Sequence, residues 1–247
     1  MNIIGLTELK NNLSNMCDKG MAYRKGGAKV PHLVLNLSPD NGQTIAAEEI
    51  TAVLQDNSLR KFCGLDPLLE YRLDGSYKQI QQIFEDIKSR AVYTNSYYGV
   101  VAIDISALSE HLNESQTDYF IEKIREVAET ATVIIYYNDS LGKRVMFLKE
   151  RVVEAIGKCI DIHLSPYSIE ELAGIVVENL KERGIEVDKG NEMKLLLCKI
   201  LDSEQVITAK QAVSTAESLV FIADYSDFVP RLDSKMLKNH IQKRNRA

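Results

Sequence analysis

The stretch LVLNLSPDNGQTIAAEEI, residues 33–50, decides the fold class of this chain. It begins with an apolar run typical of a buried strand and ends in apolar residues at helical spacing. Between the two, Asn41 and Gly42 supply a tight turn, and Thr44 can cap the helix that follows. A strand that turns at once into a helix indicates an α/β sheet.

The composition is that of an ordinary soluble globular protein. The 247 residues are 45% hydrophobic and 26% charged, which is enough for one large or two small domains with a buried core. The formal net charge of -5 argues against general binding of the body of the protein to nucleic acids or membrane surfaces.

One basic segment departs from this acidic balance. KMLKNHIQKRNRA, residues 235–247, has no acidic residue. It has two readings: a surface that touches phosphates or an acidic partner, or a solvated helix end with a frayed tail.

Cysteine and histidine usage predicts neither disulfides nor a metal cluster. No two cysteines form a C-x-x-C pair, which is typical of a reducing compartment, and no histidine lies at metal-ligand spacing from another ligand. The residues concerned are Cys17, Cys63, Cys159, Cys198, His32, His111, His163 and His240. The apolar stretches are strand-sized, far short of the roughly twenty residues that span a bilayer. We therefore expect a cytoplasmic protein with no membrane segment.

Strands and helices alternate over the first two thirds of the chain. An amphipathic helix is predicted over 5–24, with Thr7 as its N-cap. The predicted strands are 32–37, 68–75, 97–106, 131–139 and 159–164, and the helices between them are 44–56, 76–91, 115–130 and 142–157. The apolar runs at 97–106 and 131–139 are of the kind that is buried on both faces, so the pattern predicts a three-layer parallel sheet.

After Pro166 the pattern is helical only. Ser168 and Glu171 have the spacing of a capping box, and Gly184 ends the helix that they begin. Further helices are predicted over 191–203, 207–225 and 233–244. The sequence thus predicts an α/β domain over 1–165 and a small all-α domain over 166–247.

The order of these features resembles the AAA+ ATPase module. The helical opening GLTELK, the strand and loop at 33–44, the strands ending at Asp104 and near Asn138, and the phrase SPYSIEELAGIVVENLKERGIEVD at 165–188 carry the resemblance. It covers about Gly5 to Ala223 and is most similar to the CbxX/CfxQ branch, which includes red-type Rubisco activases and a sporulation ATPase. The resemblance implies a P-loop NTPase fold with a helical lid.

The phosphate-binding loop is degenerate. On the pattern G-x-x-x-x-G-K-[ST], Leu37 replaces the first glycine and Gln43 replaces the lysine that neutralises the phosphates. Pro39 removes an N–H donor and Asp40 adds a negative charge; only Gly42 and Thr44 remain suited to the task. A charged hydrogen bond contributes about 1.5 to 3 kcal/mol, so these changes together predict a loss of roughly two to four powers of ten in nucleotide affinity.

The strand VVAIDIS, residues 100–106, resembles the Walker B strand. Asp104 matches the residue that helps to hold magnesium, but Ile105 stands where the acid that polarises the attacking water should be. Since isoleucine accepts no proton, the general-base contribution of about 10² to 10⁴ in rate is absent.

Three further positions of the module are doubtful. Asn138 resembles the sensor 1 residue or caps the following turn. Arg144 and Arg151 are the candidates for an arginine finger, with surface residues of a helix as the other reading, and Lys210 is the cation nearest to the lid arginine's place.

These observations predict a pseudo-ATPase with no catalytic residue and no bound nucleotide or magnesium, which acts as a structural, adaptor or regulatory subunit. Its partners would be proteins, among them an active AAA+ subunit or a second copy. The vestigial nucleotide-binding residues are Asn41, Gly42, Gln43, Thr44, Asp104 and Asn138.

Three alternatives stay open. One is a residual ATPase with an acid supplied from elsewhere, by Glu48 or Asp139. A clamp-loader-like factor associated with nucleic acid is another, supported by the basic C-terminal segment. The last is an unrelated α/β fold in which the turn at Asn41 and Gly42 binds nothing.

Overall fold

A computed structural model describes residues 6–25, 29–38, 40–60, 62, 66–73, 75–90, 99–108 and 112–244. The chain forms two compact units. We call Leu6–Pro39 with Gln43–Leu164 the α/β unit, and Asp40–Gly42 with Ser165–Ala247 the helical unit. The predictions made for Gly5, Pro39, Cys63, His111 and residues 245–247 lie outside the described residues.

The α/β unit is built on a parallel sheet, as predicted. Within the described residues five strands pair in the order β2-β3-β4-β1-β5, and every pairing is parallel. The strands are β1 His32–Asn36, β2 Leu68–Arg72, β3 Val100–Asp104, β4 Thr132–Tyr137 and β5 Cys159–His163. Every residue of β3 and β4 is buried, which agrees with their continuous apolar runs.

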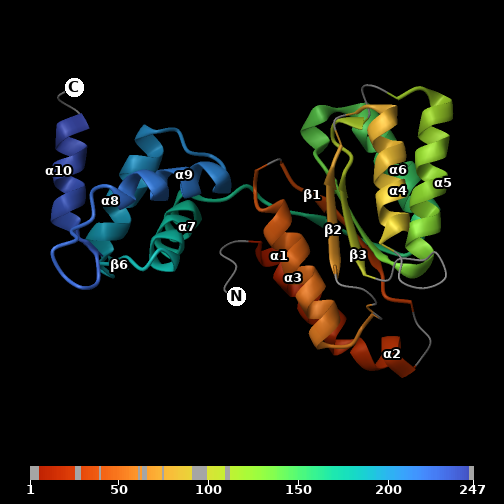
Figure 1. Cartoon of the computed structure of the whole chain (residues 1–247), viewed down its shortest axis with the longest axis horizontal. Helices are drawn as coiled ribbons and strands as arrows, with labels where there is room; N and C mark the ends of the chain where they lie inside the picture. The colour runs from red at the N-terminus through yellow and green to blue at the C-terminus, as the bar shows by residue number, and fades with distance from the viewer. Residues whose placement is uncertain are drawn as a thin grey trace. The chain divides into compact units, whose positions relative to one another are not determined.

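Helices cover both faces of this sheet. One face carries α1 and α3 and the other carries α4, α5 and α6, as Figure 1 shows. Parallel crossovers are right-handed, so the helix changes face when the chain reverses its direction across the sheet. The connection from β1 to β2 crosses the sheet in one direction, and the later connections cross it in the other direction. This places α3 on one face of the sheet and α4, α5 and α6 on the other. The bounds are α1 Thr7–Asp18, α2 Gly20–Lys25, α3 Gln43–Asp56, α4 Tyr77–Ser89, α5 Glu114–Thr130 and α6 Lys143–Ile156.

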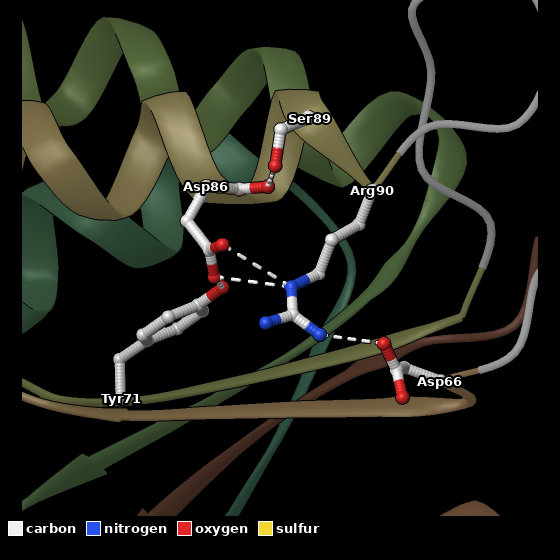
Figure 2. Close-up of polar contacts among 5 residues, drawn as sticks. All are labelled: Asp66, Tyr71, Asp86, Ser89 and Arg90. Atoms are coloured by element: carbon white, nitrogen blue, oxygen red, sulfur yellow. Dashed lines mark hydrogen bonds and ion pairs between the residues drawn. The ribbon is translucent and has the colours of Figure 1, made fainter.

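A polar network ties the edge strand β2 to α4 (Figure 2). The hydroxyl of Tyr71 donates to Asp86 Oδ2 over 2.6 Å, and Arg90 Nε donates to the same carboxylate over 3.2 Å. Arg90 Nη1 lies 2.5 Å from Asp66, and the Ser89 hydroxyl donates to the Asp86 carbonyl at 2.7 Å. The hydrogen bond from Tyr71, with help from Arg90, lowers the pKa of Asp86. Tyr71 therefore holds one face of β2 against α4.

The helical unit has its own apolar core. Its helices are α7 Ile169–Glu182, α8 Asn191–Ser203, α9 Ala209–Val220 and α10 Ser234–Arg244. The prediction of helices alone was incomplete, because β6 Glu186–Val187 and β7 Arg231–Leu232 form a small parallel pair. Two-residue strands carry no readable periodicity, and backbone hydrogen bonds such as Glu186 N–H to the Pro230 carbonyl, 2.8 Å, define them.

Of the helix N-caps predicted at Ser168 and at Thr7, the first was confirmed and the second was wrong. The capping box at Ser168 and Glu171 is present, with both of its hydrogen bonds. Thr7 is not an N-cap: Leu6 holds that place in a left-handed conformation, with φ of 52° and no side-chain cap. The helix predicted over 5–24 is also divided at Lys19 into α1 and α2. No helix among the described residues is long and apolar enough to span a bilayer.

Candidate functional site

The candidate site lies at the carboxyl edge of the sheet, where α/β folds bind ligands. In doubly wound sheets the ligand crevice opens where neighbouring strands send their helices to opposite faces. Here that point lies between β1, which leads to α3, and β4, which leads to α6. The α/β unit brings Gln43, Thr44 and Asp104 to this edge, while Asn41 and Gly42 belong to the helical unit.

Gln43, at the place of the P-loop lysine, binds the Walker B-like aspartate. Its Nε2 donates to Asp104 Oδ2 over 3.1 Å, and the backbone N–H of Ser106 donates to Oδ1 over 2.9 Å. Asp104 is only 5% exposed, and each of its two carboxylate oxygens accepts one of these hydrogen bonds. The hydroxyl of Tyr136 donates to the Gln43 carbonyl over 2.6 Å and fixes the start of α3.

Glu70 is a site residue that the sequence reasoning missed. It lies on β2, and side chains alternate along a strand, so it faces away from the Tyr71 network and toward α3. Both Glu70 and Thr44 are exposed there, and Thr44 acts to lower the pKa of the Glu70 carboxyl. A charged residue between Leu69 and Tyr71 in a predicted strand was the available signal, since it marks a polar position on the face of α3.

The site is negatively charged. Burial raises the pKa of the Glu70 carboxyl, the hydrogen bond from Thr44 opposes this, and the charges of Glu48 and Asp104 raise the pKa further. Burial, followed by the charges of Glu70 and Asp104, also holds the pKa of Tyr136 well above its ordinary value. The charges of Glu48 and Asp104 thus act on the Glu70 carboxyl at the place where phosphates would come.

The position of the catalytic acid belongs to the core. Ile105 is 0% exposed and shares its sheet face with Val101 and Ile103, in the apolar cluster formed with α4, α5 and α6. Leu37, at the place of the first P-loop glycine, is also buried, and its N–H donates to the Tyr137 carbonyl over 2.9 Å. Both apolar replacements therefore serve packing.

One buried hydroxyl at this edge has no partner. Ser106 Oγ is the buried side-chain polar atom left without a hydrogen bond among the residues that the structure describes. It follows Asp104 by two residues. A lone hydroxyl can hold a water molecule, but it carries no charge to offset a phosphate.

Asn138 caps the turn that follows it. Its Oδ1 accepts a hydrogen bond from the Ser140 N–H over 3.1 Å, which is the turn-capping reading of this residue. Asp139 is exposed, and its N–H donates to Asn36 Oδ1 over 3.3 Å.

In the helical unit, Asn41 and Asp40 bind the start of α9. Asn41 Oδ1 accepts from the Ala209 N–H over 3.3 Å, and the Asp40 carbonyl accepts from the Lys210 N–H over 3.2 Å. Lys210 Nζ also lies 3.5 Å from the Asp40 carboxylate, so this lysine partly offsets the negative charge of Asp40.

Gly42 is needed as glycine in this turn. It adopts φ of 85°, and a Cβ there would lie 2.9 Å from the Tyr167 hydroxyl. The turn therefore has a structural reason for its glycine, independent of any phosphate.

The arginine candidates lie on α6. Arg151 Nη2 forms a 2.6 Å ion pair with Asp118, and the guanidinium carbon lies 5.9 Å from the centroid of the Phe147 ring. Arg144, Arg151 and Phe147 line an open groove of about 480 Å³.

This donor set does not fit a magnesium nucleotide. The amide at the lysine position is engaged by Asp104, and carboxylates outnumber cations among these residues. Within the described residues, no three acidic, histidine or cysteine side chains are grouped so as to hold a metal ion.

The comparisons with known proteins identify the fold. No protein-family model and no curated protein matches the sequence. Among solved structures, the RuvB Holliday junction branch migration motor of Thermotoga maritima is similar, with a TM-score of 0.60 and 16% identity over 97% of this chain and 70% of that chain. A structure of a single-residue variant of the same protein gives a TM-score of 0.60 and 15% identity, over 98% of this chain and 71% of that one. At this identity the likeness concerns architecture: the chain has the AAA+ P-loop fold.

Proposed function

We propose that this chain is a pseudo-ATPase, an AAA+-fold module that acts through protein contacts and neither holds a magnesium nucleotide nor hydrolyses it. The hydrogen bond from Gln43 to Asp104 supports this most directly. In a working site the lysine at this position is free to meet phosphate. Here the residue in its place satisfies a nearly buried carboxylate, and a ligand would have to break that bond.

Charge adds to this argument. Opposite charges hold a magnesium nucleotide in P-loop enzymes, whereas this edge offers the carboxylates of Glu48, Glu70 and Asp104. The phosphates would meet like charges, and with Ile105 packed in the core no group at that position could activate water.

The role that fits such a module is structural, adaptor or regulatory, beside an active AAA+ subunit or a second copy of this chain. The groove on α6 supports it, because Phe147 is 62% exposed there between Arg144 and Arg151, and aromatic and arginine side chains are enriched at protein interfaces. A cytoplasmic location and a place near the CbxX/CfxQ branch are parts of the same proposal, the latter supported by the lid-opening phrase at 165–188.

An ATPase assay with a nucleotide melting experiment tests the proposal. We expect no turnover above background with magnesium and ATP, and the same for Gln43→Lys, because Ile105 remains in place. Millimolar ATP or ADP should leave the melting temperature unchanged, because a ligand whose concentration is well below its Kd hardly stabilises the folded protein. A magnesium-dependent rise with ATP, or turnover lost in Asp104→Ala, would instead support the residual ATPase, whose one structural support is the unpaired Ser106 hydroxyl.

A second candidate is a factor that binds nucleic acid. Two observations favour it: the similar solved structures are of a Holliday junction motor, and α10 carries the lysines Lys235, Lys238 and Lys243. Fluorescence anisotropy with linear and branched duplex DNA over a range of salt concentrations distinguishes it. Affinity that falls steeply and linearly with log salt supports this candidate, and no binding at low salt removes it.

A further inference from the structure

A cavity lined by several cationic side chains lies at the opposite, amino edge of the sheet. It has a volume of about 220 Å³, and its lining includes Lys29, His32, Arg60, Arg125 and Lys158. His32 begins β1, and its N–H donates to the Lys158 carbonyl just before β5, over 2.9 Å. All these residues belong to the α/β unit, and none of them is a residue of the candidate site at the carboxyl edge.

Arg60 is a half-buried cation that has no countercharge among the residues the structure describes. Its Nε donates to the Thr132 hydroxyl over 2.9 Å, and its Nη2 donates to the Ala131 carbonyl over 3.1 Å. Both acceptors are neutral, and no carboxylate of the described residues forms an ion pair with this guanidinium. Burial lowers its pKa. Because a buried charge is normally paired, the unpaired guanidinium indicates that an anion supplies the missing charge.

His32 adds a neutral donor. It is 6% exposed, and its Nδ1 accepts the Val133 N–H over 3.0 Å. A backbone N–H can only donate, so the neutral ring must carry its proton on Nε2. Burial, followed by the charges of Arg60 and Lys29, lowers the pKa of His32 to about 4. The ring therefore contributes an N–H donor next to the cation and no acceptor lone pair at Nε2.

The other charged side chains are exposed and mostly cationic. The cavity is lined by three exposed cations, Lys29, Arg125 and Lys158. Glu129 is the one carboxylate among the described lining residues. The Lys158 ammonium lies 5.8 Å from the centroid of the Tyr23 ring, which holds it in place. Since a water molecule takes about 30 Å³ in the liquid, the cavity has room for a tetrahedral oxyanion with part of its hydration shell.

We propose that this cavity binds the phosphate group of a small molecule, or free phosphate. Arg60 presents its planar guanidinium from within, His32 Nε2–H donates beside it, and Arg125 and Lys158 neutralise the outer oxygens. A dianion with several acceptor oxygens matches this set of donors better than a monovalent carboxylate does.

Titration of the full-length protein with inorganic phosphate tests the proposal, with sodium chloride keeping ionic strength constant. We expect a saturable rise of a few degrees in melting temperature and a shift of the His32 imidazole resonance in ¹H–¹⁵N spectra. Arg125→Gln and Lys158→Gln should each weaken phosphate binding by about threefold to tenfold. Lys88→Gln is the matched control, because it removes one exposed cation from α4, which contributes nothing to the cavity.

Three arms settle the ligand class. Acetate should have a much smaller effect than phosphate. A phosphate monoester that binds as well as phosphate indicates a phosphorylated small molecule, whereas binding of inorganic phosphate alone indicates the free ion. Equal effects of acetate and phosphate, no saturable effect at tens of millimolar phosphate, or equal affinity in the wild type and both cavity variants would overturn the proposal.

Discussion

Replacing Ile105 with glutamate restores the missing acid of the Walker B pattern, and we expect it to destabilise the protein strongly without producing an ATPase. Ile105 is 0% exposed in the core cluster of the α/β unit. Losing its burial costs about 1.5 to 3 kcal/mol. A carboxyl in such a place has a pKa near 8 to 9 instead of about 4.3, so keeping it protonated at pH 7 costs roughly 3.7 kcal/mol at about 1.36 kcal/mol per pH unit.

The sum, roughly 5 to 7 kcal/mol, is a large part of the about 5 to 15 kcal/mol that stabilises a typical domain. It also depends on pH. The folded pKa of the introduced carboxyl is raised, so its charge penalty is absent below the unfolded pKa and grows as pH rises toward the folded one. Urea unfolding should therefore show a gap between wild type and Ile105→Glu that is about 2.7 kcal/mol smaller at about pH 5.5 than at about pH 7.5.

Ile105→Gln is the control, since it has nearly the same shape as the glutamate variant and no titratable group. Its loss of stability should not change over this pH range. A stable Ile105→Glu protein that turns over ATP would refute the reasoning, because it would mean that this side chain faces a nucleotide and not the core.

Three other perturbations test single contacts. Gln43→Ala leaves one oxygen of buried Asp104 without its donor and should cost about 1.5 to 3 kcal/mol in urea unfolding. The pKa of His32 is lowered from 6.5 to about 4 in the folded protein, so protonating this histidine opposes folding. The free energy of unfolding should therefore fall by roughly 3 kcal/mol as the pH decreases from 6.5 toward 4. His32→Gln should remove this part of the acid dependence. Ser168→Ala removes the capping box with Glu171 and should cost about 1 kcal/mol, seen as earlier thermal unfolding of the helical unit.

Matched variants separate these effects from general damage. Gln82→Ala on the exposed face of α4 and Ser218→Ala on the exposed face of α9 should each change stability by less than about 0.5 kcal/mol. If Gln43→Ala changed the stability no more than Gln82→Ala does, the hydrogen bond from Gln43 to Asp104 would not stabilise the protein. An acid unfolding curve unchanged in His32→Gln would mean that other groups set the acid limit.

Much of the fold was readable because its signals are local. Periodicity alone located the strands of the sheet and the helices between them, and the two uninterrupted apolar runs indicated β3 and β4 as strands buried on both faces. The capping box at Ser168 was readable for the same reason, since its two partners are three residues apart. The pair β6 and β7 was missed, because 43 residues separate Val187 from Arg231 and neither strand has a pattern of its own.

The sequence by itself determined which chemical groups are present: no lysine at position 43, no acid at position 105, and an alternation of elements that permits an AAA+ fold. Only the tertiary structure decided which groups meet. It joined Gln43 to Asp104, and it placed Arg60 in one cavity with His32, where no carboxylate of the described residues forms an ion pair with the guanidinium. The physical reason is that hydrogen bonds and charges act over a few ångströms in space, while sheet topology brings together residues that lie far apart along the chain, and no local pattern records that proximity.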